Sequence, residues 1–356
     1  MDDKFTQILS LLKKIASQNQ LYVWLLILTL FLGAFSSLHK DFFSSEKDIA
    51  IAAADTAALR KIPQEELFKI LDKDKLLSRL LGITFLFGLL IFSAGIYLLV
   101  RFLPGIIKHR TLFASGGMNM AHWTILDILR AVIIIIFFTH FLYVAEPLFF
   151  RLFNLVAPNI FARLFFKSLA VDMFALGVVL YFVIAKYAAD FVSLGLDFGN
   201  FVRNLKIGLV HYIALIPILL MVVLVSITAA SVFKYEPEPA AVFAIFFGPQ
   251  PKIILLLFIL FITVFGPIIE EIFFRGFCYP ALRKKVGPFK SAVSVSIIFA
   301  WLHMNMIGFL PIFLLGLLLV YLYEKTNSLV ASIVVHVIHN SAVLYLVFLY
   351  RCLVLK

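Results

Sequence analysis

The stretch IGLVHYIALIPILLMVVLVSITAASV, residues 207–232, decides the class of fold. It contains no Lys, Arg, Asp or Glu. A helix of this length, rising about 1.5 Å per residue, crosses the roughly 30 Å of hydrocarbon in a bilayer. Its backbone N–H and C=O groups find their partners within the helix, as a chain in lipid requires. Residues 207–232 are therefore predicted to form a transmembrane helix.

Similar apolar stretches follow one another along the chain. Of its 356 residues, 63% are hydrophobic and 14% are charged, and the mean hydropathy is +1.05. This composition leaves too little polar surface for a soluble globule. We predict an all-α fold, a polytopic membrane helical bundle with about eight or nine transmembrane helices. The expected spans are residues 21–38, 80–103, 125–148, 169–192, 207–232, 252–279, 290–305, 309–323 and 329–350.

The apolar spans divide the chain into three regions. Residues 1–20 have the apolar face of an interfacial amphipathic helix. Residues 21–120 are expected to form an N-terminal membrane region, interrupted at 39–79 by a charged, Ala-rich excursion outside the membrane with a helix after Pro63. Residues 121–356 are predicted to form the membrane core.

The net charge of +11 reflects topology rather than nucleic-acid binding, because the basic residues are scattered between apolar spans. If the N-terminus is cytoplasmic, the inner loops collect most of the basic residues. We therefore expect a multi-pass protein with a cytoplasmic N-terminus, whose surroundings are the lipid bilayer and which has no nucleic-acid partner. The inner-loop residues counted are Arg101, Lys108, Arg110, Arg203, Lys206, Arg283, Lys284, Lys285 and Lys290.

Several ionisable residues fall inside the predicted spans, where charge is costly and usually has a reason. Asp127 and Lys186 lie near span ends, so we expect their side chains to extend to the membrane surface. Arg130 and Asp172 are a candidate ion pair between the third and fourth spans.

A pair of adjacent glutamates begins the most informative part of the chain. Glu271 and Arg275 are four residues apart on a helix, a spacing that favours a salt bridge. Glu270 is rotated by about 100° from Glu271 and is free to point elsewhere. An unpaired carboxylate in a low-dielectric bundle suits a general acid or base.

Three more polar side chains reach the depth of Glu270. Counted from the basic loops at about 1.5 Å per residue, Glu270, His303, His336 and Asn340 all lie roughly 17 to 22 Å into the membrane. His336 and Asn340 are four residues apart and share a helix face. This set fits hydrolysis, with Glu270 and His303 polarising a water and with His336 and Asn340 donating hydrogen bonds to an oxyanion.

Three motifs in these spans resemble one known family. Glu270-Glu271-Ile-Phe-Phe-Arg275, Phe299-Ala-Trp-Leu-His303 and His336-Val-Ile-His-Asn340 are similar to the E-E-x-x-x-R, F-x-x-x-H and H-x-x-x-N motifs of the CAAX prenyl protease type II and bacteriocin-processing (CPBP, Abi) family of glutamic intramembrane proteases. The resemblance covers about residues 250–345.

The resemblance implies a glutamic endopeptidase without metal or other cofactor, in a bacterial plasma membrane, acting on a peptide or a membrane protein. It implies that the catalytic residues are Glu270, His303, His336 and Asn340, and that Glu271 and Arg275 support them together with Phe299, the first residue of the second motif. His339 is expected to face away from the site.

Two alternatives remain open. In a zinc-dependent membrane metallopeptidase, Glu270, His303 and His336 would be the ligands, although the chain has no H-E-x-x-H motif. A catalytically inactive transporter or immunity-type partner protein would instead use the charged residues of the other spans as a pathway. The sequence has no detectable inverted repeat that would favour a transporter.

Overall fold

The chain forms a bundle of long apolar helices in a computed structural model that describes residues 17–38, 64–109, 121–153, 160–235, 246–247 and 251–354. No strand occurs within these ranges. The first half of the bundle consists of α2 (Gln20–Leu38), α5 (Gln64–Lys73), α6 (Lys75–His109), α7 (Ile125–Leu152), α8 (Ile160–Leu180), the π-helix η1 (Tyr181–Lys186), the short 3₁₀ turn η2 (Val192–Leu194) and α9 (Phe201–Val232).

The second half contains the motifs. One continuous helical rod runs from Lys252 to Val286 and is interrupted by two π-helical turns. Its segments are α11 (Lys252–Leu260), η3 (Phe261–Phe265), α12 (Gly266–Glu271), η4 (Ile272–Cys278) and α13 (Tyr279–Val286), followed along the chain by α14 (Pro288–Leu302), α15 (Met306–Thr326) and α16 (Leu329–Val354).

Eight of the described helical segments are long and apolar enough to cross a bilayer. The predicted multi-pass helical membrane fold is confirmed. The expected span 290–305 is the exception, because α14 has 15 residues and falls short of the roughly 20 that a crossing needs. Met304, with φ of 48°, and Asn305, whose side chain accepts the N–H of Gly308, turn the chain at this point.

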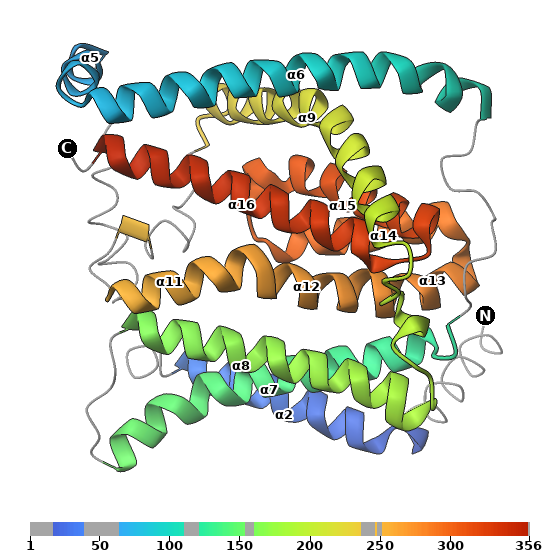
Figure 1. Ribbon diagram of the computed structural model, residues 1–356. Coiled ribbons are helices and arrows are strands. Elements are labelled where there is room, and N and C mark those ends of the chain that lie inside the picture. Colours follow the sequence, from blue (N-terminus) through green and yellow to red (C-terminus); the bar gives the residue numbers. More distant parts are fainter. Residues whose placement is uncertain are drawn as a thin grey trace.

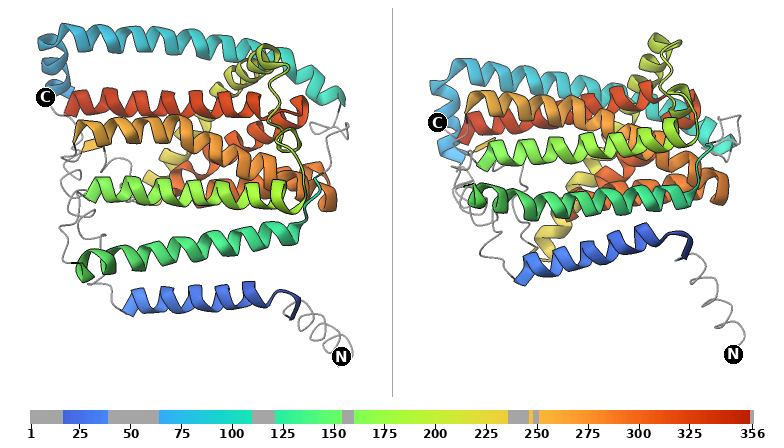
Figure 2. Two further views of the ribbon diagram at one scale, coloured as in Figure 1. Left: turned by 60° about the horizontal axis from the view of Figure 1, so that its bottom comes forward. Right: turned by 90° about the horizontal axis from the view of Figure 1, so that it is seen from below.

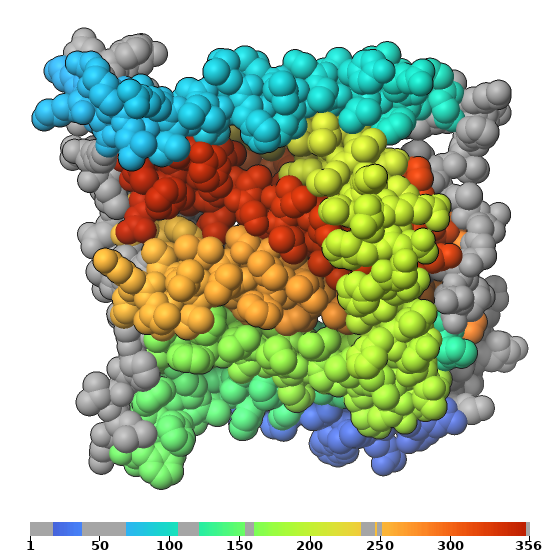
Figure 3. Space-filling view, viewed as in Figure 1, coloured from blue at the N-terminus to red at the C-terminus, as the bar shows by residue number. Residues whose placement is uncertain are grey.

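The motif helices lie in the middle of the bundle. Figure 1 shows α6 along one edge and α2 along the opposite edge, with α11, α12 and α16 between them, and Figure 2 shows the same order from two other directions. The described ends of α2 and α16 nearest the chain termini lie at opposite ends of the bundle (Figure 2). Figure 3 shows α8 in direct contact with the rod that contains α11 and α12.

The fourth span begins nine residues earlier than the sequence predicts, at Ile160 rather than at residue 169. Arg163 and Lys167 were expected in the preceding loop, but both form ion pairs with Glu146 of α7. The shared carboxylate offsets part of the charge of these two cations, which lowers the cost of continuing the helix through them.

The predicted N-terminal regions are described only in part. Residues 1–16 of the predicted interfacial helix and residues 39–63 of the predicted excursion lie outside the described residues. The helix expected after Pro63 is present as α5. The next span begins at Lys75, earlier than expected, with the side chain of Asp74 accepting the N–H of Leu77 at its first turn.

Two expectations about charged side chains in the spans are wrong. The side chain of Asp127 does not extend outward but is buried, where it pairs with Lys186 and accepts the hydroxyl of Tyr187. Arg130 pairs with Asp127 and donates to the side chain of Asn19, so it is not the partner of Asp172. The cations instead converge on one buried carboxylate at the start of α7, because Thr124 and Asp127 form its capping box there.

Candidate active site

A fully buried ion pair between Glu271 and Arg275 lies at the centre of the site. Arg275 Nη1 donates to Glu271 Oε1 over 2.6 Å, and both residues are fully buried. Arg275 Nη2 also donates to the carbonyl of Gly316 in α15, 3.2 Å away. The predicted salt bridge of the first motif is therefore present. It fixes the rotation of α12 and links this helix to α15.

His336 joins the two glutamates. Its Nδ1 lies 2.9 Å from Glu271 Oε1, and its Nε2 lies 3.6 Å from Glu270 Oε2. Glu271, which is paired with Arg275, accepts at this contact, so Nδ1 carries the proton. The first and third motifs, 65 positions apart in the sequence, thus meet inside the bundle.

Glu270 differs from its neighbour in its surroundings. Its side chain is 36% exposed, whereas that of Glu271 is 0% exposed. In each of the two carboxylates, the oxygen Oε2 is buried and has no hydrogen-bond partner among the described residues. The 3.6 Å that separates Glu270 Oε2 from His336 Nε2 is too long for a hydrogen bond. Glu270 is therefore a partly exposed side chain with one buried, unused acceptor oxygen.

The ring of Phe299 connects the second motif to the other two. The Arg275 guanidinium lies 4.4 Å from its centroid, which is within reach of a cation–π interaction. The imidazole of His336 meets the same ring at 5.6 Å, and that of His303 meets it at 4.8 Å. Phe299 is buried, so its position is fixed, and it holds three side chains of the site by packing.

His303 lies at the exposed end of α14. Its Nδ1 donates to the carbonyl of Phe299 over 2.7 Å, which leaves Nε2 as an acceptor in the neutral ring. Among the described contacts there is none between His303 and Glu270. His303 is therefore near the cluster, through Phe299, without touching the carboxylate with which it was expected to act.

Asn340 is held by a defect in the facing helix. In a regular α-helix the N–H of Gly266 would donate to the carbonyl of Ile262, but in the π-helical turn it donates to Phe261 O instead. The next residue, Pro267, has no N–H to replace it. The carbonyl of Ile262 therefore has no donor within its own helix. Asn340 Nδ2 donates to this carbonyl over 2.9 Å. His336 and Asn340 therefore face the same rod, as their spacing predicts. One N–H of the Asn340 amide is used by the backbone.

His339 faces away from the glutamates. Its Nδ1 lies 3.1 Å from the hydroxyl of Tyr212 in α9. Burial among helices α9 and α16 and the hydrogen bond to Tyr212 give it a packing role, in agreement with the predicted orientation.

Asp172 is a residue near the site whose position the sequence did not reveal. It lies midway along α8, is half-buried, and its carboxylate interacts electrostatically with Glu270. It has no hydrogen bond or ion pair within the described part of the chain. The central position of Asp172 in a span was the one sign of a functional role in the sequence. A single sequence, however, does not predict which helix α8 packs against.

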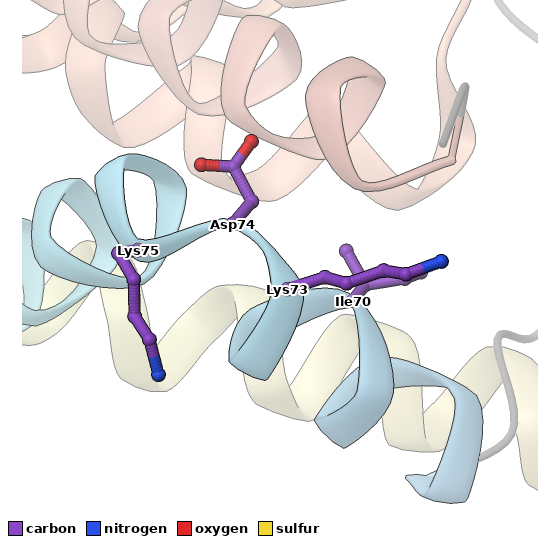
Figure 4. A pocket seen from close by; sticks show the side chains of 4 residues that line it. All are labelled: Ile70, Lys73, Asp74 and Lys75. Carbon is purple, nitrogen blue, oxygen red and sulfur yellow. The ribbon is translucent and has the colours of Figure 1, made fainter.

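Other features of the described residues do not form a second site. A hollow of about 470 Å³ at the junction of α5 and α6 is lined by Ile70, Lys73, Asp74 and Lys75 (Figure 4). It lies on the surface, and Lys75 pairs there with Asp72. No group of three His, Cys, Asp or Glu side chains among the described residues is arranged to hold a metal ion.

Comparison with known proteins identifies the segment that contains all three motifs. Residues 252–342 match the family model described as Type II CAAX prenyl endopeptidase Rce1-like. The predicted family resemblance is confirmed, and at the level of the family it supports a CAAX-type protease, a hydrolase of the membrane. Neither the search of curated proteins nor the search of solved structures found a match.

Proposed function

We propose that this multi-pass membrane protein, whose segment 252–342 matches the type II CAAX prenyl endopeptidases, hydrolyses a peptide bond with a water activated by Glu270. One observation carries the proposal: an oxygen of the Glu270 carboxylate is buried without a hydrogen-bond partner and lies 3.6 Å from His336 Nε2. A carboxylate with an unused acceptor inside a low-dielectric bundle suits a general base. Its partial exposure leaves room for water and substrate to reach it.

His303 would hold the same water. Because its Nδ1 donates to Phe299 O, its Nε2 accepts in the neutral ring and can orient a water proton. Its location at the exposed end of α14 suits a residue that meets the substrate. The geometry supports this role less directly than that of Glu270, since no described contact joins the two side chains.

His336 and Asn340 would stabilise the oxyanion. His336 already donates Nδ1–H to Glu271, so a donation from Nε2 requires a proton on both ring nitrogens, which places a positive charge opposite the developing oxyanion. Asn340 donates one N–H to Ile262 O, and its second N–H remains for the oxyanion. Glu271 and Arg275 hold His336 in place and do not take part in proton transfer.

The zinc alternative does not fit the observed arrangement. It requires Glu270, His303 and His336 around one ion with bonds of about 2 Å. His336 and Glu270 approach each other, but the described residues contain no group of three ligands of suitable geometry. Metal analysis of the purified protein with an activity assay in chelator is the direct test. Stoichiometric zinc that is lost together with activity would replace the proposed mechanism.

The proposal is tested with the full chain in lipid vesicles and a farnesylated peptide that ends in a C-A-A-X sequence, beside the same peptide without the lipid. Cleavage products are identified by mass spectrometry. The variant Glu270→Gln keeps the shape of the side chain and removes the base, so turnover should fall at least about 100-fold. Equal product patterns for the wild type and this variant would contradict the proposal.

Asp190→Asn is the matched control for the loss of one carboxylate. Asp190 lies in the exposed loop after η1, and hydrogen bonds from the Ser193 hydroxyl and backbone N–H lower its pKa. It is therefore ionised at neutral pH, and the substitution removes one negative charge far from the site. This variant should keep the turnover of the wild type.

A further inference from the structure

The carboxylate of Asp172 is not used by the water-activating mechanism above. Three observations concern its place beside Glu270: the level of the two residues in the membrane, their electrostatic interaction, and the engagement of every nearby cation with another partner. Each is independent of the family match, because Asp172 lies outside the matched segment 252–342.

Ring contacts fix the register between α8 and the rod of α11 to α13. Phe165 of α8 packs against Phe258 and Phe261, with ring centroids 5.4 and 5.9 Å apart. Farther along, Phe182 packs against Phe277 at 6.1 Å. The two rods therefore run side by side in the same direction, as Figures 1 and 3 also show.

Both contacts place Asp172 and Glu270 at nearly the same level. Measured from the first contact at about 1.5 Å per residue, Asp172 lies roughly 10 Å along α8, and Glu270 lies roughly 13 Å along the rod from Phe261 and roughly 18 Å from Phe258. Measured from the second contact, the difference is about 4 Å. The two residues are thus separated along the bundle by roughly one helical turn, near the middle of their spans.

The carboxylate of Asp172 has no cation to stabilise its charge. Within the described part of the chain its electrostatic partner is Glu270, which carries the same charge. The charged side chains of the neighbouring elements are engaged elsewhere, as the following ion pairs show. Glu146 of α7 binds Arg163 and Lys167, Asp127 binds Arg130 and Lys186, and Glu271 binds Arg275.

Two carboxylates on neighbouring helices at nearly the same depth, one of them without a cation among the described residues, do not both ionise, because like charges in a low dielectric repel and each charge is costly there. One of the two keeps a proton. With a proton on both ring nitrogens, as its oxyanion role requires, His336 places a positive charge 3.6 Å from Glu270, so Glu270 is the member whose negative charge is better stabilised. Asp172 is the member that keeps the proton.

We propose that Asp172 is a further catalytic residue, the general acid that protonates the amine leaving group while Glu270 acts as the base. This inference rests on the proposed function. A pair of carboxyl groups with opposite proton states is the arrangement that acid–base hydrolysis uses.

The protons balance over one turnover. Glu270 takes a proton from water as the oxygen of that water forms a bond with the scissile carbonyl carbon. As the C–N bond breaks, the Asp172 carboxyl gives its proton to the leaving nitrogen. The proton on Glu270 then passes to Asp172, which restores the initial state, and water has been added across the peptide bond.

The test compares leaving groups. The farnesylated C-A-A-X peptide is made in two forms, with the scissile bond either as an amide or as an ester. An amine cannot leave without a proton, whereas an alkoxide leaves far more readily. Asp172→Asn should therefore reduce amide hydrolysis about 100-fold and change ester hydrolysis by less than about threefold.

Two further variants keep the test decisive. Asp172→Glu retains a carboxyl group and should restore a substantial part of amide hydrolysis, which also guards against a folding defect of the Asn variant. Asp190→Asn should leave both substrates unaffected. A loss in Asp172→Asn that is equal for amide and ester, or no loss in either, would overturn the role of Asp172. If the wild type and Glu270→Gln do not differ on either substrate, the proposed function itself fails.

Discussion

At the scale of single residues, the two adjacent glutamates have opposite tasks. Glu271 is fully buried and bound by Arg275 and His336, so it orients other side chains. Glu270, one position earlier, is partly exposed and forms no salt bridge with Arg275 among the described contacts, although each glutamate has one buried oxygen without a hydrogen-bond partner. A rotation of about 100° along the helix is enough to separate the two environments. The spacing of the first motif predicts this division, because Arg275 lies four residues after Glu271 and not after Glu270.

Removal of Arg275 would leave a buried negative charge on Glu271. We expect Arg275→Ala to lower stability by about 3 to 5 kcal/mol, since the guanidinium is fully buried and its loss leaves Glu271 uncompensated. The measurement is the unfolding of the purified protein in detergent. The double variant with Glu271→Gln removes the orphaned charge and should recover part of the loss. A single variant as stable as the wild type would show that the pair does not hold the site together.

At the scale of helices, irregular turns determine what the side chains can reach. The π-helical turn η3 and the missing N–H of Pro267 release the carbonyl of Ile262, and this carbonyl binds Asn340 of α16. A second π-helical turn, η4, contains Arg275. Such turns are frequent at functional sites because they reorient side chains within an otherwise regular helix. The short helix α14 is another irregular element, since it ends at Leu302 and leaves His303 exposed at its C-terminal end.

Pro267→Ala tests the importance of the released carbonyl. The new backbone N–H can bond within the helix, regularise the turn and compete with Asn340 for its acceptor. We expect activity on the cleaved peptide to fall roughly 10- to 100-fold without a loss of thermal stability, because small displacements of catalytic groups are costly. Pro280→Ala, in the first turn of α13 of the same rod, is the control. Equal activities of the two variants would contradict a special role for the turn at Pro267.

At the scale of the whole molecule, the distribution of basic residues predicts the orientation in the membrane. The basic residues after Lys186 and around α13 lie at the end of the bundle where α8 and α13 finish, and Figure 1 shows these two ends on the same side. The predicted cytoplasmic location of this end follows from the tendency of Lys and Arg to remain inside. The central place of α12, α14 and α16 is also a property of the whole molecule, because α2 and α6 lie at its opposite edges.

Single cysteines in a Cys352→Ser background test the orientation. Cys278 is buried and should remain unlabelled in the folded protein. A membrane-impermeant maleimide should label Lys234→Cys in intact cells and should reach Asp190→Cys only after the cells are permeabilised, because the two positions lie at opposite ends of α9. The reverse pattern would place the N-terminus outside.

Hydrophobic length and charge spacing were sufficient to predict the membrane bundle, the ion pair of Glu271 with Arg275 and the common face of His336 and Asn340. These features are local, because they depend on the 3.6-residue period and on the cost of charge in lipid. The periodicity of one helix does not predict which other helices lie beside it. Only the packed bundle shows that Lys186 pairs with Asp127, that Asn340 binds the carbonyl of Ile262 and that α8 brings Asp172 close to the level of Glu270. The depth of a side chain in the membrane and the direction in which it points follow from its own helix. A contact between two helices depends on how the helices pack.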